Sequence, residues 1–283
     1  MSTDKGPVAL PGERSLRTSD IATEVGVHAN TVRLYEEWGY LPPIPRTEAG
    51  YRQFNSIHLA QMKLARFAFA DPFPGRHIRR SLAALVRLAA LGNYSGAYDV
   101  AHEHKALVVR EIALAEAAAD YLERWVAGEV EVEDQAPGIL SGQAAGLLQI
   151  TKDTLRHWER NGLINPPRDP QNGYRRYGTE EISRLQVLRL LTRAGYSTMA
   201  VLRTVRSLDS GRPLDRGRPL DRGRHANLSE LLDSPSEDED VLYATDRWLT
   251  TLRIHEERSS LIARHIKAMI TLVEPSNGAK TFS

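Results

Sequence analysis

Two short runs of the sequence combine threonine, arginine and glutamate at helical spacing. One spans Thr31–Glu36 around Arg33, and the other spans Thr154–Glu159 around Arg156. A helix lying in the major groove of DNA turns its N-terminal residues toward the base edges, and arginine can bind guanine through two hydrogen bonds. The two runs therefore predict two sites that read DNA bases.

A Gly-Tyr-Arg triplet follows each run, at Gly50–Arg52 and at Gly173–Arg175. A glycine turn followed by alternating aromatic and basic residues is typical of a small β-hairpin, or wing. Tyrosine and arginine side chains on such a hairpin can bind phosphates, which fixes the register of a protein on the duplex but reads no sequence. We therefore predict backbone contacts beside each base-reading run.

Together these patterns predict one set of DNA-binding residues. They are His28, Asn30, Thr31, Arg33, Tyr51, Arg52, Thr151, Lys152, Thr154, Arg156, Tyr174, Arg175 and Arg176. Asp153 stands among them, and either base selection or capping of the helix would explain it. Tyr35, Trp158 and Phe54 are expected in the core, because aromatic residues at helical spacing are usually buried.

The sequence segments that position these residues also occur twice in the chain. Ala22 and Ala145, Gly39 and Gly162, and Pro43 and Pro166 all match at the offset of 123 residues that aligns the two arginines, and no gap is needed. A fixed offset over tens of residues indicates two copies of one structural unit. Each copy reads as helix, glycine turn, helix, which is the helix-turn-helix pattern.

Helix starts and stops give the expected elements. In the first unit the helices and hairpin are expected at 20–25, 30–38, 50–54, 56–70 and 76–91. In the second unit they are expected at 141–148, 152–161, 174–177, 179–193 and 197–207. Each unit precedes a long helix, at 93–128 and 237–273.

Apolar residues in the two long helices alternate in steps of four and three, as in a coiled coil. The C-terminal helix carries the clearer pattern, at Val241, Thr245, Trp248, Leu252, His255, Ser259, Ile262, Ile266, Met269 and Val273. The other is weaker and carries Val100, Leu107, Leu114, Ala118, Tyr121 and Trp125, with His104 and Glu111 as polar interruptions. Plain packing of each helix on a core is the alternative.

The predicted fold is mainly α, with two winged helix-turn-helix domains, each followed by a long helix, and the long helices pairing as an antiparallel coiled coil. Glycine and proline residues and runs of charged residues predict where one segment of the chain ends and the next begins. The segments are a flexible arm 1–14, the first winged unit 15–92, a long coiled-coil helix 93–128, an acidic linker 129–138, the second winged unit 139–208, a low-complexity linker 209–236, the C-terminal coiled-coil helix 237–273 and a tail 274–283.

Charge and composition narrow the function. The net charge is +1, but it is +4 over 14–80 and +6 over 139–206, which favours polyanion binding by the two units. The chain has no cysteine, which excludes disulfides, thiolate metal sites and thiol redox sensing. Without a signal peptide pattern or a long apolar run, we expect a cytoplasmic, nucleoid-associated protein that contacts no membrane.

The segments 16–54 and 140–177 resemble the winged-helix domain of the MerR family of bacterial transcription regulators. The runs Thr31–Glu36 and Thr154–Glu159, with the glycines and Tyr-Arg pairs that follow, carry the resemblance. It implies a DNA-binding regulator that activates transcription by distorting a promoter, with double-stranded promoter DNA and RNA polymerase as partners. By the resemblance, Arg33 and Arg156 match family DNA-contacting positions, although Leu34 and His157 stand where an aromatic is common.

Family proteins usually carry one such unit per chain and dimerise through their long helices. We therefore expect this chain to act as a single-chain pseudodimer on an asymmetric operator. A repressor acting as a conventional homodimer is the alternative, and the sequence does not identify an effector or a promoter.

Two other function classes are weaker. A small-molecule binder could use the aromatic residues Tyr121, Trp125, Tyr243 and Trp248, although helix packing explains them better. We expect no enzyme, no catalytic residue, no metal and no cofactor, because the chain lacks a phosphate-binding glycine loop, a nucleophile elbow and an HExxH motif.

Overall fold

The computed structural model describes residues 15–70, 72, 75–131, 134, 138–210, 232–233 and 247–273. For residues 207, 209 and 210 it describes the backbone but not the side chain. The arm, the tail, most of the low-complexity linker and the predicted start of the C-terminal helix at 237–246 lie outside the described residues. Almost all regular structure is helical, as expected for a mainly α fold.

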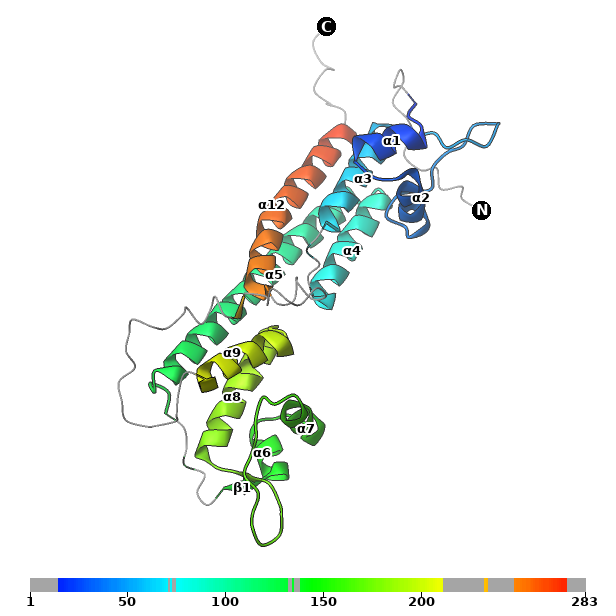
Figure 1. Cartoon of the computed structure of the whole chain (residues 1–283). Helices are drawn as coiled ribbons and strands as arrows, with labels where there is room; N and C mark the ends of the chain where they lie inside the picture. Colours follow the sequence, from blue (N-terminus) through cyan, green and yellow to red (C-terminus); the bar gives the residue numbers. More distant parts are fainter. Residues whose placement is uncertain are drawn as a thin grey trace. The chain divides into compact units, whose positions relative to one another are not determined.

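The chain divides into two compact units: 1–109 with 253–283, and 110–252. Unit 1 contains α1 (Thr18–Glu24), α2 (Ala29–Glu37), α3 (Ser56–Ala68), α4 (Arg76–Ala90), the first half of α5 (Tyr94–Val126) and most of α12 (Trp248–Val273). Unit 2 contains the rest of α5, β1 (Ile139–Leu140), α6 (Ser141–Leu147), α7 (Lys152–Arg160), β2 (Arg176–Tyr177), α8 (Thr179–Arg193), α9 (Thr198–Ser210) and the start of α12 (Figure 1). The units therefore cut across the two predicted long-helix segments, since each long helix contributes to both.

Both units begin with the same arrangement of helix, turn and helix. Gly26 separates α1 from α2 with a φ of +65°, a left-handed conformation that glycine adopts without strain. At the corresponding turn of unit 2 Gln149 takes this conformation, with a φ of +51°, which is uncommon for a residue with a side chain. Gly39 and Gly162 end α2 and α7 in the same way.

The third helix of each unit anchors the turn that follows the second helix. In unit 1, the side-chain amide of Gln61 donates hydrogen bonds to the carbonyls of Tyr40 and Val86, both at 2.9 Å. In unit 2, Nε of Arg184 donates to the carbonyl of Leu163 at 2.9 Å. Two different side chains on equivalent positions thus fix the second helix against the third.

The hairpin loops that follow α2 and α7 are closed by isolated antiparallel bridges. Arg46 pairs with Arg52, and Arg168 pairs with Arg175. The first members of these pairs lie 122 residues apart and the second members 123 apart, so the second hairpin holds one more residue. In unit 2 the hairpin ends in β2, which pairs antiparallel with β1.

The match of Pro43 with Pro166 is therefore wrong. The burial pattern places Pro43 at the position of Asn165, and Ile44 at that of Pro166. Unit 1 has one extra residue after its second helix, and the longer hairpin of unit 2 restores the offset. These two one-residue shifts cancel, so a comparison of the sequences does not reveal them when the motifs on either side agree at a constant offset.

Most of the predicted heptad face of α12 is buried. Its described members Trp248, Leu252, His255, Ser259, Ile262, Ile266 and Met269 are all buried, whereas Val273 is largely exposed. Part of this helix packs on α3 within unit 1, where His265 contacts the carbonyl of Ala60 at 2.8 Å and Arg258 donates to the carbonyl of Ala70 at 2.6 Å. Figure 1 shows α12 running along α3. Pairing of the two long helices along their whole length stays a prediction.

The buried face of α5 is displaced by one residue from the predicted one. The buried positions are Tyr94, Ala97, Ala101, His104, Val108, Ala115, Ala118, Ala119 and Leu122, whereas Leu114 is 49% exposed. Alanine lets neighbouring helices approach closely, so small residues form most of the packed side, together with Val108 and Leu122.

Candidate nucleic-acid interface

The predicted base-reading residues lie at the N-terminal ends of α2 and α7. His28 caps α2, and its Nδ1 accepts a hydrogen bond from the backbone N–H of Asn30 at 3.2 Å. Thr151 caps α7, and its hydroxyl accepts one from the N–H of Thr154 at 3.0 Å. Each cap satisfies one of the unpaired N–H groups at a helix start, and the other free N–H groups leave positive potential there that favours anions.

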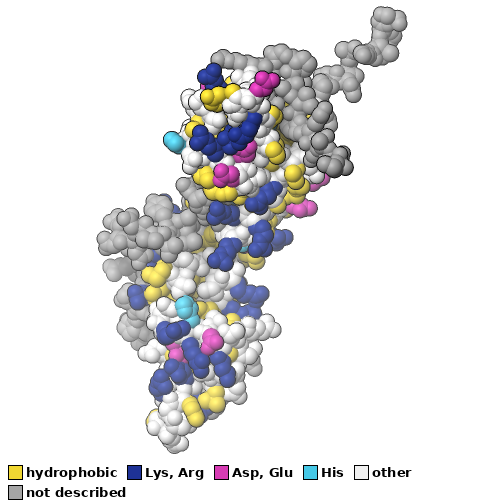
Figure 2. Space-filling view, turned by 90° about the vertical axis from the view of Figure 1, so that its right-hand side faces the viewer, with side chains coloured by type: hydrophobic (Ala, Val, Ile, Leu, Met, Phe, Trp, Pro, Cys, Tyr) yellow, Lys and Arg dark blue, Asp and Glu magenta, His cyan; other side chains and the backbone are white. Residues whose placement is uncertain are grey.

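The structure leaves most of the predicted residues accessible in their own units. His28, Asn30, Arg33, Tyr51, Thr151, Lys152, Arg156 and Tyr174 are exposed, and Thr31, Arg52, Thr154, Arg175 and Arg176 are half-buried. Tyr51 is 75% and Tyr174 64% exposed, which is unusual for a tyrosine with only a packing role. Figure 2 shows Lys and Arg side chains gathered on the visible face of each unit, with few acidic side chains among them.

In unit 1, a glutamate at the end of the second helix holds the hairpin loop. Glu36 accepts Nε of Arg52 on one carboxylate oxygen at 2.6 Å and the backbone N–H of Ile44 on the other at 3.2 Å. In unit 2, Glu159 accepts Nε of Arg175 at 2.7 Å. The predicted phosphate-binding arginines are thus fixed at Nε, and their terminal N–H groups remain for other partners.

The second oxygen of Glu159 is satisfied differently, because Pro166 stands at the position of Ile44 and has no N–H. The hydroxyl of Tyr177 donates to this oxygen at 2.7 Å, whereas unit 1 has Phe54 there. In unit 1 the backbone N–H of Ile44 is the donor and Phe54 has no hydroxyl. In unit 2 Pro166 has no N–H and the hydroxyl of Tyr177 is the donor. Sequence reasoning missed this role of the glutamates, although an acidic residue recurring at the repeat offset together with an arginine was a usable signal.

Tyr177 is the most enclosed member of this cluster. Burial raises the pKa of Tyr177 to about 12, and the hydrogen bond to the Glu159 carboxylate acts in the same direction. The phenol therefore stays a donor at all physiological pH values.

We expect Tyr177→Phe to lower the free energy of unfolding by about 1–3 kcal/mol, because it leaves an oxygen of Glu159 without its donor in a part-buried site. Denaturant unfolding of the full chain measures the loss, and faster amide exchange in β1, β2 and α7 would locate it. Tyr174→Phe, the same change on an exposed ring, should cost less than about 0.5 kcal/mol. Equal losses from the two variants would contradict the role of Tyr177.

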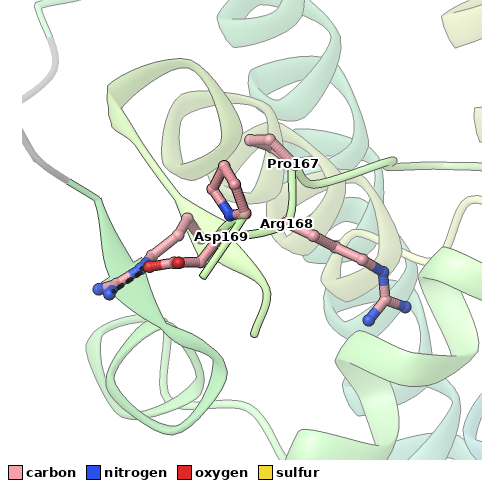
Figure 3. Close-up of a pocket in the computed structure, with 5 residues that line it drawn as sticks. Pro167, Arg168 and Asp169 are labelled. Atoms are coloured by element: carbon pink, nitrogen blue, oxygen red, sulfur yellow. Dashed lines mark hydrogen bonds and ion pairs between the residues drawn. The ribbon is translucent and has the colours of Figure 1, made fainter. Parts of the chain in front are cut away.

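Arg176 was predicted to contact DNA, and in the structure it binds inside its own unit. Its guanidinium donates to one oxygen of Asp169 at 2.9 and 3.2 Å and to the carbonyl of Gly138 at 3.4 Å. The backbone N–H of Gln171 and the side chain of Arg176 lower the pKa of Asp169. This pair lines a shallow hollow of about 290 Å³. Figure 3 shows the pair, with Arg168 pointing away from Asp169. Arg168 is exposed, so it is better placed than Arg176 to meet a phosphate.

A second hollow of about 380 Å³ lies beside α7. Its lining residues are Gln149, Ile150, Thr154, Trp158, Arg189, Thr192 and Arg193. Arg189 donates to the side chain of Gln149 at 3.3 Å. Sequence reasoning did not select Arg189 and Arg193, because α8 reads as a packing helix and only the fold brings its last turns next to the start of α7.

The described residues contain no group of three or more histidine, aspartate or glutamate side chains arranged to hold a metal ion. In the same part of the chain, no helix combines the length and the apolar composition needed to cross a bilayer.

Comparisons with known proteins match the two units separately. The model described as "MerR family regulatory protein" matches residues 17–54, and the model described as "MerR HTH family regulatory protein" matches residues 140–208. No solved structure matches the chain.

Curated relatives align with only part of the chain. The HTH-type transcriptional regulator CueR of Salmonella typhi is 38% identical over 53 residues, which are 19% of this chain and 38% of the relative. The mercuric resistance operon regulatory protein of Bacillus cereus is 32% identical over 56 residues, 20% of this chain and 42% of the relative. CueR of Yersinia pestis is 32% identical over 68 residues, 24% and 49% of the two chains.

The chain thus spans less than half the length of these relatives. Their names and the matching family models describe regulators rather than enzymes, which agrees with the prediction that this chain is not an enzyme. The two matched segments therefore support a MerR-type regulator that carries two MerR-type units in one chain.

Proposed function

We propose that this protein is a sequence-specific DNA-binding regulator of transcription, in which each unit acts as a winged helix-turn-helix domain. One observation carries the proposal. An exposed, arginine-bearing helix start and an exposed hairpin tyrosine occur together in both units, and a glutamate holds each hairpin to its helix. A purely structural repeat does not require solvent-facing arginines and tyrosines at matching positions.

The residues divide into two roles. Asn30, Thr31 and Arg33 in unit 1, and Lys152, Thr154 and Arg156 in unit 2, are placed to meet base edges from the starts of α2 and α7. The hairpin pairs Tyr51 with Arg52 and Tyr174 with Arg175 are placed to hold phosphates. His28 and Thr151 cap their helices and can also face a phosphate, and Arg176 acts mainly by stiffening its hairpin.

We further propose that one chain binds both half-sites as a pseudodimer, with the long helices paired to hold the two units. The half-sites would be centred roughly 34 Å apart, one turn of DNA, or a multiple of this spacing. Activation would follow from distortion of promoter DNA, which costs several kcal/mol and is offset by phosphate contacts. RNA polymerase is then a second partner in the cytoplasm, and repression by a conventional homodimer is the alternative.

A small-molecule-binding function receives less support. Nε1 of Trp248 donates to the carbonyl of Ala194 at 2.7 Å, and Nε1 of Trp125 donates to the hydroxyl of Ser183. Both indoles are thus engaged in helix packing rather than lining an open site, and Tyr243 lies outside the described residues. A small-molecule effector remains a question for ligand screening.

Separate substitutions of the two reading arginines test the proposal. We expect Arg33→Ala to weaken protection of one half-site and Arg156→Ala to weaken the other, each by about 1–3 kcal/mol. Footprinting on DNA upstream of the protein's own gene measures this, with and without RNA polymerase. Arg264→Ala, which removes an exposed arginine of α12, should leave both half-sites unchanged.

Loss of both half-sites to the same extent from either variant would contradict a fixed assignment of units to half-sites. The mass of the complex in solution separates the pseudodimer, with one chain per operator, from a homodimer with two.

A further inference from the structure

The starts of α2 and α7 differ in charge at one position that the repeat aligns. Asp153 stands in unit 2 where Asn30 stands in unit 1, each three residues before the reading arginine. Oδ1 of Asp153 accepts from Nη1 of Arg156 at 3.1 Å, with the aspartate 87% and the arginine 67% exposed. The guanidinium of Arg33, by contrast, forms no hydrogen bond or ion pair with any other residue that the structure describes.

Capping does not explain this aspartate. Thr151 is the residue that caps α7, through its hydroxyl and the N–H of Thr154. Asp153 lies in the first turn, where a carboxylate gains a little from the helix dipole, but an exposed ion pair at this spacing contributes only modestly to stability. A negative charge on a surface that meets DNA also repels phosphates, so its presence there calls for a different explanation.

The hydrogen-bonding groups of the DNA bases offer an explanation for Asp153. In the major groove a carboxylate accepts a hydrogen bond from the N4 amino group of cytosine, whereas an amide side chain bonds to N6 and N7 of adenine. Arginine has five N–H donors, so Arg156 can keep its contact with Asp153 and still bind O6 and N7 of a guanine. The ion pair would also limit the rotamers of Arg156, which orients it before DNA is bound.

We propose that Asp153 is a specificity-determining residue that makes the two half-sites different, a proposal that rests on DNA binding by both units. Asp153 selects cytosine in the half-site of unit 2 and positions Arg156 on a neighbouring guanine. Asn30 selects adenine at the equivalent place in the half-site of unit 1. The operator is then asymmetric at a base pair that the aligned position of the repeat identifies.

Reciprocal exchange of the two residues tests this inference. The full chain, Asp153→Asn and Asn30→Asp each select sites from a library of randomised DNA duplexes, and the selected sequences are compared. In Asp153→Asn we expect cytosine to give way to adenine at one position of one half-site, with discrimination between the two bases changing about tenfold or more. In Asn30→Asp we expect the converse change in the other half-site alone.

Binding to unselected duplexes supplies a second readout. Removing a negative charge should tighten the binding of Asp153→Asn to such DNA several-fold at low salt, with a smaller gain at high salt. Both positions are exposed, so thermal unfolding should be unchanged, which separates altered recognition from misfolding.

The possible outcomes are distinct. Unchanged base preference in Asp153→Asn, with binding intact, overturns the inference and leaves the proposed function standing. A wild-type site that is symmetric at this base pair also overturns it. Failure of the wild-type chain to enrich any duplex instead sinks the proposed function itself.

Discussion

Replacing His104 by leucine is expected to protect the protein against acid and to leave it at least as stable at neutral pH. His104 lies on α5 within unit 1, where it is 1% exposed. Neither of its ring nitrogens has a hydrogen-bond partner among the described residues. An unsatisfied buried polar group costs free energy, and replacing it by an apolar side chain of similar size removes that cost.

The pH dependence follows from the surroundings of this imidazole. Burial lowers the pKa of His104 to about 4, and repulsion from His255 on α12 adds to the shift. Burial also lowers the pKa of His255, whose Nε2 contacts the carbonyl of Pro72 and which lies near the positive charge of Arg258. His255 therefore lies near two other groups of unit 1 that carry or can acquire positive charge, His104 and Arg258.

The sign of the effect is set by which state takes up the proton. His104 has a pKa of about 4 in the folded chain and about 6.5 when unfolded. Above pH 6.5 both states are neutral and no stability is lost. As the pH falls from 6.5 toward 4, the unfolded state gains the proton first, so the free energy of unfolding drops, by about 3 kcal/mol in total at roughly 1.4 kcal/mol per pKa unit.

Urea unfolding of the full chain between pH 7 and pH 4 measures this drop. We expect His104→Leu to lose much less stability over that range than the wild type. His102→Leu, two residues away on the exposed side of the same helix, should keep the wild-type acid loss. If the two variants follow the same curve, His104 is not the group responsible.

The exposed residues of the candidate nucleic-acid interface could be predicted from the sequence, because their exposure depends on where nearby helices begin and end. Caps and glycines mark where helices begin and end, and α8 has the predicted bounds, Thr179–Arg193. The starts of α2 and α7 are each within one residue of their predicted positions. A residue at the start of a helix in a helix-turn-helix pattern is exposed almost regardless of distant packing, so Arg33 and Arg156 could be selected early.

Contacts that depend on register could not be predicted in the same way. The pairs of Glu36 with Arg52 and Glu159 with Arg175 require the hairpin to fold back on the helix, over 16 residues in each unit. The equivalence of Ile44 with Pro166 was hidden by the one-residue shift between the two copies, whereas Phe54 and Tyr177 match at the constant offset.

The face of α5 shows a second limit of sequence patterns. Both the predicted and the observed stripes run in steps of four and three, and they share His104 and Ala118. An alanine-rich helix is apolar on several sides, so periodicity alone does not choose between neighbouring stripes. Which face of α5 is buried depends on the packing of its small residues against other helices, and this tertiary contact cannot be seen in the sequence of α5 alone.

The largest loss of stability in unit 2 is expected from Gly195→Ala, at roughly 2–5 kcal/mol. Gly195 follows Ala194, the C-cap residue of α8, with a φ of +96°, in a backbone region that residues with a side chain rarely adopt. A Cβ atom there would lie 2.5 Å from Nε1 and 2.6 Å from Cε2 of Trp248. Backbone strain and a steric clash therefore add at one position.

The indole cannot easily move away. Trp248 is buried, and its Nε1 donates to the carbonyl of Ala194 at 2.7 Å. This bond satisfies a carbonyl at the C-terminal end of α8, where the helix itself provides no partner. Displacing the ring breaks the bond and opens space beside α8, so the start of α12 loses this contact with the end of α8.

Gly173→Ala isolates the backbone contribution. Gly173 has a φ of +71° in the hairpin of the same unit, and a Cβ atom there would meet nothing within 4 Å. This control should cost about 1–2 kcal/mol, the price of a left-handed conformation alone. Denaturant unfolding of both variants measures the difference, and it should equal the cost of moving Trp248, whereas equal losses would mean that the tryptophan yields freely.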